Sequence, residues 1–319
     1  MSTIEKAVKI IFQKCVPLKK SESCLIITDE NKFSIGKMLF FEALKISKKV
    51  ELLEIPIGKM HGEEPPRIIA DRMLKYDVII CPTTKSLTHT NAVIKARKNG
   101  AKVATLPGIT EEVLKRCIDV DYVEMKRLTN KIADTLDKGK SVLLTTKSGT
   151  KLSMEISGVK AHGRECGMIT KKGELTNLPE AECYLAPLYG KTNGVYVVDA
   201  SQSGVGKLKT PIKITVENGF ATKIEGGNDA IKFGKILKSV NNKNAYNIAE
   251  FGIGTNKNAK ITGVILEDEK VYGTCHIALG KNDSFGGRVN VPIHVDGVIN
   301  KPTIIVDGKV LMKDGKIIS

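Results

Sequence analysis

The pattern of apolar residues changes near residue 139, and this change constrains the fold more than any other feature of the sequence. Before it, apolar strand-like runs such as 25–28, 50–55 and 78–82 alternate with helix-like stretches. Continuous apolar runs joined by helices are typical of a parallel sheet that is covered on both faces. We therefore predict a doubly wound, Rossmann-like α/β domain over residues 1–137.

Turn motifs replace this alternation after Gly139. Asn218-Gly219, Asp307-Gly308 and Asp314-Gly315 are each flanked by apolar residues. Such pairs favour the tight turn of a β-hairpin because both of their residues tolerate positive φ. A single helix-like stretch, 230–237, interrupts the short strands. We therefore predict a second, mainly antiparallel β domain over residues 138–319.

The composition limits the classes of protein to which the chain can belong. Its 319 residues suffice for two domains. The net charge is +15, but the lysines are dispersed and no arginine-rich segment is present, so we expect no specific nucleic-acid partner. The sequence contains neither an apolar run long enough to cross a bilayer nor a secretory signal pattern. We expect a cytoplasmic protein without a membrane partner.

Motifs for three common kinds of site are missing. The seven cysteines are an odd number without a C-x-x-C pair, which argues against a disulfide framework and against a thiolate zinc finger. No G-x-G-x-x-G motif follows the strand 25–28, and the acidic pair Asp29-Glu30 behind it would repel a pyrophosphate. A dinucleotide site of the usual kind is therefore not expected.

A histidine and an aspartate lie two residues apart in a strand-like run over 292–299. Because side chains alternate along a strand, His294 and Asp296 project from the same face, as two ligands of one metal ion would. The chain has five histidines, and His276 lies nearby in another apolar run. His61 and His162 are expected in surface loops.

Two glutamates complete a possible metal site. Glu182 and Glu250 are each flanked by apolar or small residues, where a carboxylate is costly to bury without a cationic partner. Together with His276, His294 and Asp296 they form the mixed nitrogen and oxygen set that suits zinc, cobalt, manganese or iron. Five such ligands can hold two ions.

The segments that carry these residues resemble, in order, the metal-binding motifs of the thermophilic metallo-aminopeptidase family. They are residues 177–187, 249–254, 275–280 and 294–296. In that family an α/β domain precedes a β-rich domain with a two-metal site, and the enzymes are dimers that trim N-terminal residues from peptides. The resemblance implies the following metal ligands, with Glu250 as the bridging carboxylate: Glu182, Glu250, His276, His294 and Asp296.

The resemblance also implies an activity, that of a metal-dependent aminopeptidase-like hydrolase. Two divalent ions of zinc, cobalt or manganese would activate a bridging water and polarise the scissile carbonyl. Glu182 or Glu269 would carry the proton to the leaving amine. The expected partners are a peptide or small-molecule substrate and a second copy of the chain.

Departures from the family pattern leave other functions open. Asp283 stands where the family has a tyrosine, and Val271 stands where it has an acidic residue. Segments 86–90 and 106–110 resemble more closely a divergent branch near the 2,5-dihydroxypyridine dioxygenases. The alternative is therefore a ring-cleaving dioxygenase with one non-haem Fe(II), for which two histidines and one carboxylate suffice. A third possibility is a catalytically silent protein that a metal stabilises.

Overall fold

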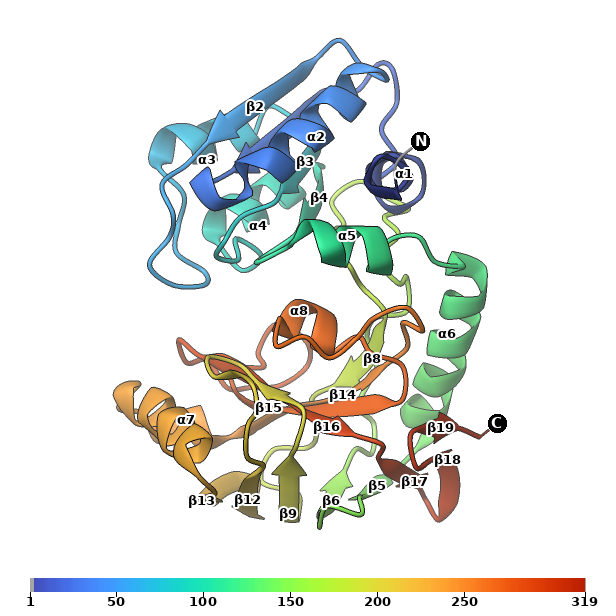
Figure 1. The fold of residues 1–319 in the computed structure, drawn as a ribbon, viewed down its shortest axis with the longest axis vertical. Coiled ribbons are helices and arrows are strands. Elements are labelled where there is room, and N and C mark those ends of the chain that lie inside the picture. The colour runs from blue at the N-terminus through green and yellow to red at the C-terminus, as the bar shows by residue number, and fades with distance from the viewer. Residues whose placement is uncertain (1–2, 319) are drawn as a thin grey trace. The chain divides into compact units, whose positions relative to one another are not determined.

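The computed structural model describes residues 3–318 and combines helices with β-sheets (Figure 1). The mixed α/β class predicted from the sequence is confirmed. The chain forms two compact units, one of residues up to 121 together with 167–180 and one of residues 122–166 together with 181 onward. Helix α6 (Tyr122–Lys138), most of which lies within the first domain predicted over residues 1–137, groups with the second unit. A boundary at residue 137 between independently folding domains stays a prediction.

Within residues 3–318, the first unit holds a five-stranded parallel sheet with the strand order β2-β1-β3-β4-β7. Its strands are β1 (Cys24–Thr28), β2 (Val50–Glu54), β3 (Val78–Cys81), β4 (Lys102–Thr105) and β7 (Leu175–Asn177). Its α-helices are α1 (Thr3–Ile10), α2 (Phe33–Leu44), α3 (Arg67–Met73), α4 (Asn91–Lys98) and α5 (Glu111–Cys117), with short helical turns at Ile11–Cys15 and Glu30–Lys32.

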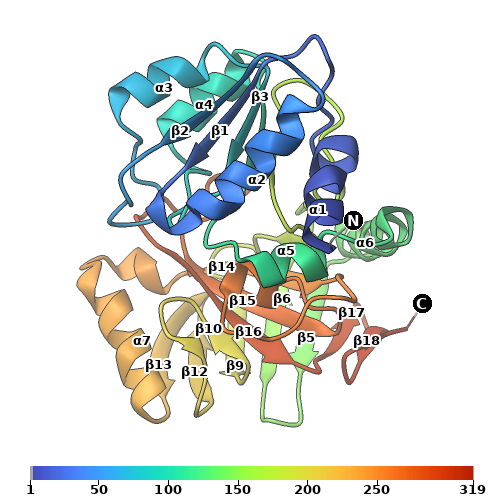
Figure 2. The same ribbon diagram turned by 45° about the horizontal axis from the view of Figure 1, so that its top comes forward.

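Helices cover both faces of this sheet (Figure 2). Leu25 and Ile27 of β1 belong to the same buried cluster as Ile69 of α3 and Val93 of α4, while α2 also contacts β1. Every residue of β1 is buried. Because both faces must be apolar, the strand reads as a continuous apolar run in the sequence.

The described part of the second unit holds two antiparallel sheets. The six-stranded sheet has the order β11-β10-β16-β15-β14-β8, and the eight-stranded sheet has the order β13-β12-β9-β6-β5-β17-β18-β19. The strands of the six-stranded sheet are β8 (Glu182–Leu185), β10 (Ser201–Gln202), β11 (Gly206–Lys207), β14 (Ile248–Gly254), β15 (Thr274–Gly280) and β16 (His294–Asn300). Those of the other sheet are β5 (Ser141–Thr145), β6 (Lys151–Glu155), β9 (Thr192–Val198), β12 (Ile212–Glu217), β13 (Phe220–Glu225), β17 (Thr303–Val306), β18 (Lys309–Lys313) and β19 (Lys316–Ile317). The remaining helices are α7 (Asn228–Ser239), α8 (Ile265–Asp268) and a 3₁₀ turn at Lys243–Tyr246.

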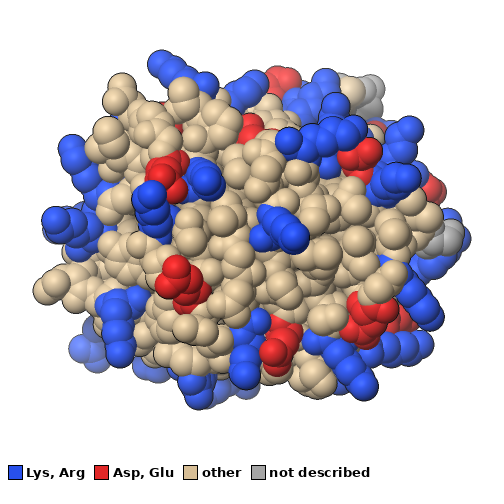
Figure 3. All heavy atoms as spheres, turned by 90° about the horizontal axis from the view of Figure 1, so that it is seen from below, with Lys and Arg blue, Asp and Glu red and all other residues tan. Residues whose placement is uncertain are grey.

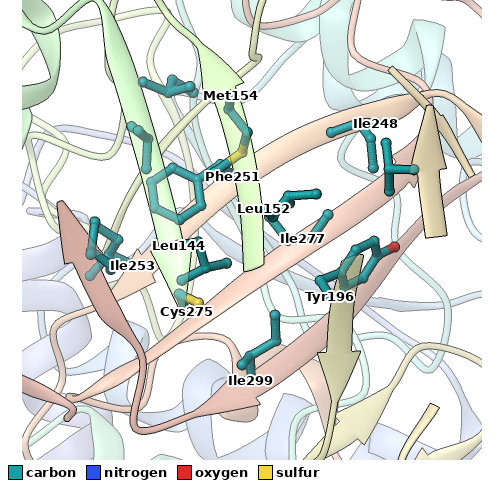
Figure 4. Close-up of a cluster of buried hydrophobic side chains, with 14 of the residues drawn as sticks. Leu144, Leu152, Met154, Tyr196, Ile248, Phe251, Ile253, Cys275, Ile277 and Ile299 are labelled. Atoms are coloured by element: carbon teal, nitrogen blue, oxygen red, sulfur yellow. The ribbon is translucent and has the colours of Figure 1, made fainter. Parts of the chain in front are cut away.

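The two sheets of the second unit enclose one hydrophobic core (Figure 4). Phe251 of β14 and Ile277 of β15 pack in it with Leu144, Leu152 and Tyr196 of the eight-stranded sheet. Alternate residues of β14 and β15 enter this core, so the intervening residues project from the opposite face of the six-stranded sheet. That opposite face carries the predicted metal ligands.

Three β-hairpins have their turns at the Asn-Gly and Asp-Gly pairs that the sequence analysis identified. Glu217 pairs with Phe220 across Asn218-Gly219, and the same two-residue spacing recurs at Asp307-Gly308 and Asp314-Gly315. Both residues of each pair have positive φ, as a type I′ turn requires. These turns are set by local sequence.

Replacing the glycines of two of these turns separates backbone strain from steric contact. At Gly308 (φ 79°) a Cβ would meet no atom within 4 Å, whereas at Gly219 (φ 78°) it would lie 2.7 Å from the backbone nitrogen of Gly190. We expect Gly308→Ala to lower the free energy of unfolding by about 1 kcal/mol through the positive φ alone. Gly219→Ala should cost about 1–3 kcal/mol more because of the contact. Urea unfolding measures both, and equal losses would contradict this account.

Two further observations concern the distribution of surface charge and the length of the helices. On the face in Figure 3, lysine and arginine side chains are dispersed among uncharged and acidic ones. None of the helices in residues 3–318 is both long and apolar enough to cross a membrane.

Candidate metal centre

The predicted ligands project from neighbouring strands of the six-stranded sheet. Glu250 of β14 and Asp296 of β16 both pair with Ala278 of β15. His276 precedes Ala278 by two residues, and His294 precedes Asp296 by two. The period of two along each strand therefore places all four side chains on one face. Glu182, the first residue of β8, pairs with Gly254 of β14 at the edge of the same group.

Glu250 lies between the two imidazoles. Its Oε1 is 3.2 Å from Nε2 of His276, and its Oε2 is 3.5 Å from Nε2 of His294. Oε2 of Glu182 lies 3.4 Å from His276 Nε2, and Oδ1 of Asp296 lies 3.4 Å from His294 Nε2. The structure thus brings the five residues into two overlapping groups that share Glu250. Their role as metal ligands stays a prediction.

The two histidines are held in different ways. The side chain of His276 is 0% exposed and that of His294 is 32% exposed. Nδ1 of His294 donates a hydrogen bond to the backbone carbonyl of Lys281 at 2.8 Å. A carbonyl can only accept, so this bond leaves Nε2 of the neutral ring without a proton and able to bind a cation. Nδ1 of His276 is buried without a hydrogen-bond partner in the described chain, so that ring is oriented from its Nε2 side.

Gly252 makes room for the His276 ring. It pairs with His276 across β14 and β15, and a Cβ at residue 252 would lie 2.0 Å from Nε2 of that ring. No side chain larger than hydrogen fits there without displacing the imidazole. The small residue is therefore part of the site.

The carboxylates favour the protonated form of both rings in the metal-free protein. Burial lowers the pKa of His276, but the hydrogen bond to Glu250 and the charge of Glu182 outweigh it and raise this pKa to about 9. Burial likewise lowers the pKa of His294, but Asp296 and Glu250 raise it to about 10. Burial raises the pKa of Asp296, whereas the charge of His294 lowers it to about 2. The site attracts positive charge, and a metal ion that binds there displaces protons.

A buried lysine, which the sequence analysis missed, contacts the acidic residues. The Lys270 side chain is 1% exposed, and its Nζ lies 2.6 Å from Oε1 of Glu182 and 2.7 Å from Oε1 of Glu269. Burial raises the pKa of Glu269, and the charge of Lys270 opposes that shift. Lys270 follows three acidic residues in sequence, a pattern more typical of a solvated surface, so no local feature marks it as buried.

An aromatic cluster adjoins His294, and it includes a histidine that was expected in a surface loop. The ring of His162 stacks on Tyr184 at 5.4 Å between centroids, and Tyr184 makes an edge contact with Phe285 at 5.5 Å. Phe285 in turn meets His294 at 5.9 Å. His162 is half-buried and forms a β-bridge with Tyr184, so its surface-loop assignment was wrong. We call His162, Tyr184 and Phe285 the aromatic wall.

The residue that replaces the aminopeptidase tyrosine takes no part in this arrangement. Asp283 is exposed and lies 3.6 Å from Nζ of Lys281. Glu269, one of the two predicted proton carriers, forms an ion pair with Lys270 at 2.7 Å. Both features depart from the expected hydrolytic centre.

Comparison with known proteins corrects the functional prediction. The family model of 2,5-dihydroxypyridine 5,6-dioxygenase matches residues 48–319. A 2,5-dihydroxypyridine 5,6-dioxygenase of Pseudomonas putida KT2440 is 24% identical over 253 residues, which cover 74% of this chain and 70% of the relative. The predictions of an aminopeptidase, a hydrolase and a protease are therefore wrong, and the dioxygenase alternative is the better supported reading.

Two solved structures share the fold. The 2,5-dihydroxypyridine dioxygenase of P. putida KT2440 superposes with a TM-score of 0.83 at 18% identity, covering 100% of this chain and 98% of its own. AmpT from Thermus thermophilus superposes with a TM-score of 0.73 at 13% identity, covering 99% of each chain. The likeness to AmpT concerns the fold alone. With the family model matching most of its length, the chain belongs to the 2,5-dihydroxypyridine 5,6-dioxygenase family.

Proposed function

We propose that this protein is a ring-cleaving dioxygenase that uses one Fe(II) ion and dioxygen to open a dihydroxylated pyridine. The observation that carries the proposal is the pair of imidazole Nε2 atoms on either side of Glu250, next to an aromatic wall. Two histidines and one carboxylate form the ligand set of many non-haem Fe(II) oxygenases. The substrate class comes from the family.

Each histidine Nε2 lies at a distance from its carboxylate neighbours that suits adjacent ligands of an octahedral ion. Around an ion with ligands at about 2.1 Å, neighbouring ligand atoms lie about 3.0 Å apart. The distances from each histidine Nε2 to the nearest carboxylate oxygens are 3.2–3.5 Å, and the two histidines belong to groups that share Glu250. His276 and His294 would supply nitrogen, and Glu250 or Asp296 would supply oxygen.

The surrounding residues would bind and orient the substrate. When bound, Fe(II) supplies the redox chemistry by which dioxygen reacts with an aromatic ring. The carbonyl of Lys281 keeps His294 in the tautomer that can bind the ion. The carboxylate of the Glu250 and Asp296 pair that does not bind the ion could accept the proton of a substrate hydroxyl group. In the reaction as proposed, the bond between ring carbons 5 and 6 breaks and both atoms of dioxygen enter the product.

The direct test measures oxygen uptake by protein loaded with one equivalent of Fe(II). We expect 2,5-dihydroxypyridine and dioxygen to be consumed in equal amounts, and labelled dioxygen to place two heavy atoms in the product. The metal-free protein is the control. Oxygen uptake no greater than in that control, across a panel of dihydroxylated pyridines and benzenes, would refute the proposed function.

The aromatic wall provides a second prediction, on substrate affinity. Phe285 lies between Tyr184 and His294, so Phe285→Leu should remove a ring contact worth about 0.5–1.5 kcal/mol. We expect KM for the aromatic substrate to rise about 2- to 10-fold, with iron content unchanged. Phe220→Leu is a matched control, because Phe220 makes an edge contact with Tyr189 at 5.6 Å in the other sheet. A similar rise in KM for both variants would argue against a substrate contact.

A further inference from the structure

We propose that Lys270 is a built-in cation that takes the place of a second divalent ion and limits this acidic site to one metal. The inference rests on the single-ion site of the proposed function. It concerns the five convergent residues, which by number and type could hold two ions. The presence of an ammonium group among them decides how many ions they hold.

The ammonium group lies where a second ion would find its ligands. Glu182 turns Oε1 toward Lys270 at 2.6 Å and Oε2 toward His276 at 3.4 Å. Glu182, Glu250 and His276 form one of the two groups that could hold an ion. Oε1 of Glu182 in that group is thus already bound to a cation, and a second ion would need that oxygen.

Charge favours one divalent ion together with Lys270 over two divalent ions. Glu182, Glu250 and Asp296 lie with Glu269 around the site, and Lys270 also acts on the charges of Asp296 and Glu269. A buried ammonium group is stable only when carboxylates compensate it, and here two do so at hydrogen-bond distance. A second divalent ion would have to compete with the ammonium group for Glu182 while being repelled by it.

The backbone of Lys270 holds the side chain in this position. Its N–H donates to the carbonyl of Glu267 at 2.9 Å, and its own carbonyl accepts from the N–H of Asn256 at 2.8 Å. The loop packs directly on β14, because a Cβ at Gly254 would lie 2.7 Å from the carbonyl carbon of Lys270. The lysine is therefore fixed by both its backbone and its carboxylate partners.

The test counts manganese(II) ions bound per chain after equilibrium dialysis of the whole protein. We expect one ion in the wild type and in Lys270→Arg, which keeps the charge. Lys270→Met, which removes it at similar length, should bind two ions. The two ions should also give a spin-coupled electron paramagnetic resonance spectrum, since they would share Glu250. A count of one in Lys270→Met would overturn the inference.

Thermal unfolding provides a second readout that does not depend on turnover. Lys270→Met leaves Glu182 and Glu269 without their ammonium partner, so saturating manganese should raise its midpoint by more than it raises that of the wild type. Lys102→Met is the matched control, because Lys102 is also buried and pairs with Glu22 at 3.0 Å in the first unit. It should lose stability without gaining a metal ion.

The remaining outcomes also decide the question. If Lys270→Met fails to fold even with manganese in the medium, a second ion does not replace the lost charge and the inference is wrong. If the wild type binds two ions, both the inference and the single-iron proposal fail. If the wild type binds one ion and Lys270→Met binds two, but no dihydroxypyridine is consumed with iron, only the proposed function fails.

Discussion

His276→Gln should remove iron binding and ring cleavage together. The His276 ring is fully buried, and its Nε2 lies within 3.4 Å of Glu182 and Glu250, so no solvent-exposed group can replace it as a nitrogen ligand. Loss of an outer partner of a metal ligand costs about 10–100-fold in metal affinity or activity. Loss of the ligand itself should therefore exceed about 100-fold in both. Iron content after anaerobic dialysis and oxygen uptake measure the two effects.

The matched control is His61→Gln. His61 lies in the first unit, where its Nδ1 accepts a hydrogen bond from the backbone N–H of Ser86 at 3.1 Å. We expect this variant to keep its iron and to remain folded. A His276→Gln protein that retains one tightly bound iron would show that the metal is held elsewhere.

Gly252→Ala should disrupt the same site through a single methyl group. Its Cβ would lie 2.0 Å from Nε2 and 2.2 Å from Cε1 of His276, closer than any non-bonded contact allows. Either the ring rotates away from Glu250 or β14 and β15 separate. Because both movements displace a ligand, we expect iron affinity to fall by about 10–100-fold and the free energy of unfolding to fall by about 1–3 kcal/mol.

Gly234→Ala separates this steric effect from the general effect of replacing a glycine. Gly234 lies in α7, and a Cβ there would meet no atom within 4 Å. Alanine is the better helix former, so this variant should gain up to about 1 kcal/mol in stability and keep its iron. Iron titration compares the metal affinity of the two variants. Thermal unfolding followed by circular dichroism compares their stability. Unchanged iron affinity in Gly252→Ala would mean that His276 does not bind the metal.

The family assignment could not be reached securely from the ligand motifs. The segments around Glu182, Glu250, His276 and His294 resemble those of the metallo-aminopeptidases, and AmpT shares the fold at 13% identity. Such motifs indicate that strands can present ligands to a metal, but they do not specify the reaction. The reaction depends on what surrounds the ligands. The replacement of the expected tyrosine by Asp283 was the sequence feature that pointed away from peptide hydrolysis.

Some parts of the fold have no local signature in the sequence. Strand β7 (Leu175–Asn177) pairs with β4 in the first unit. The two strands that precede it in sequence, β5 and β6, belong to the second unit. Three residues are too few to show a periodicity, and only the tertiary pairing defines the strand. The grouping of α6 with the second unit likewise depends on contacts distant in sequence, such as the hydrogen bond between Thr129 and Thr255.

Features that depend on neighbouring residues could be predicted from the sequence. The type I′ turn at Asn218-Gly219 follows from the two residues that form it, and the common face of His294 and Asp296 follows from the period of two along a strand. The cation that pairs with Glu182 and the rings that lie beside His294 could not be predicted in this way. Those contacts join Lys270 to Glu182 and His162 to Tyr184. They depend on strand register and loop packing, because residues distant in sequence meet only after the sheet has formed.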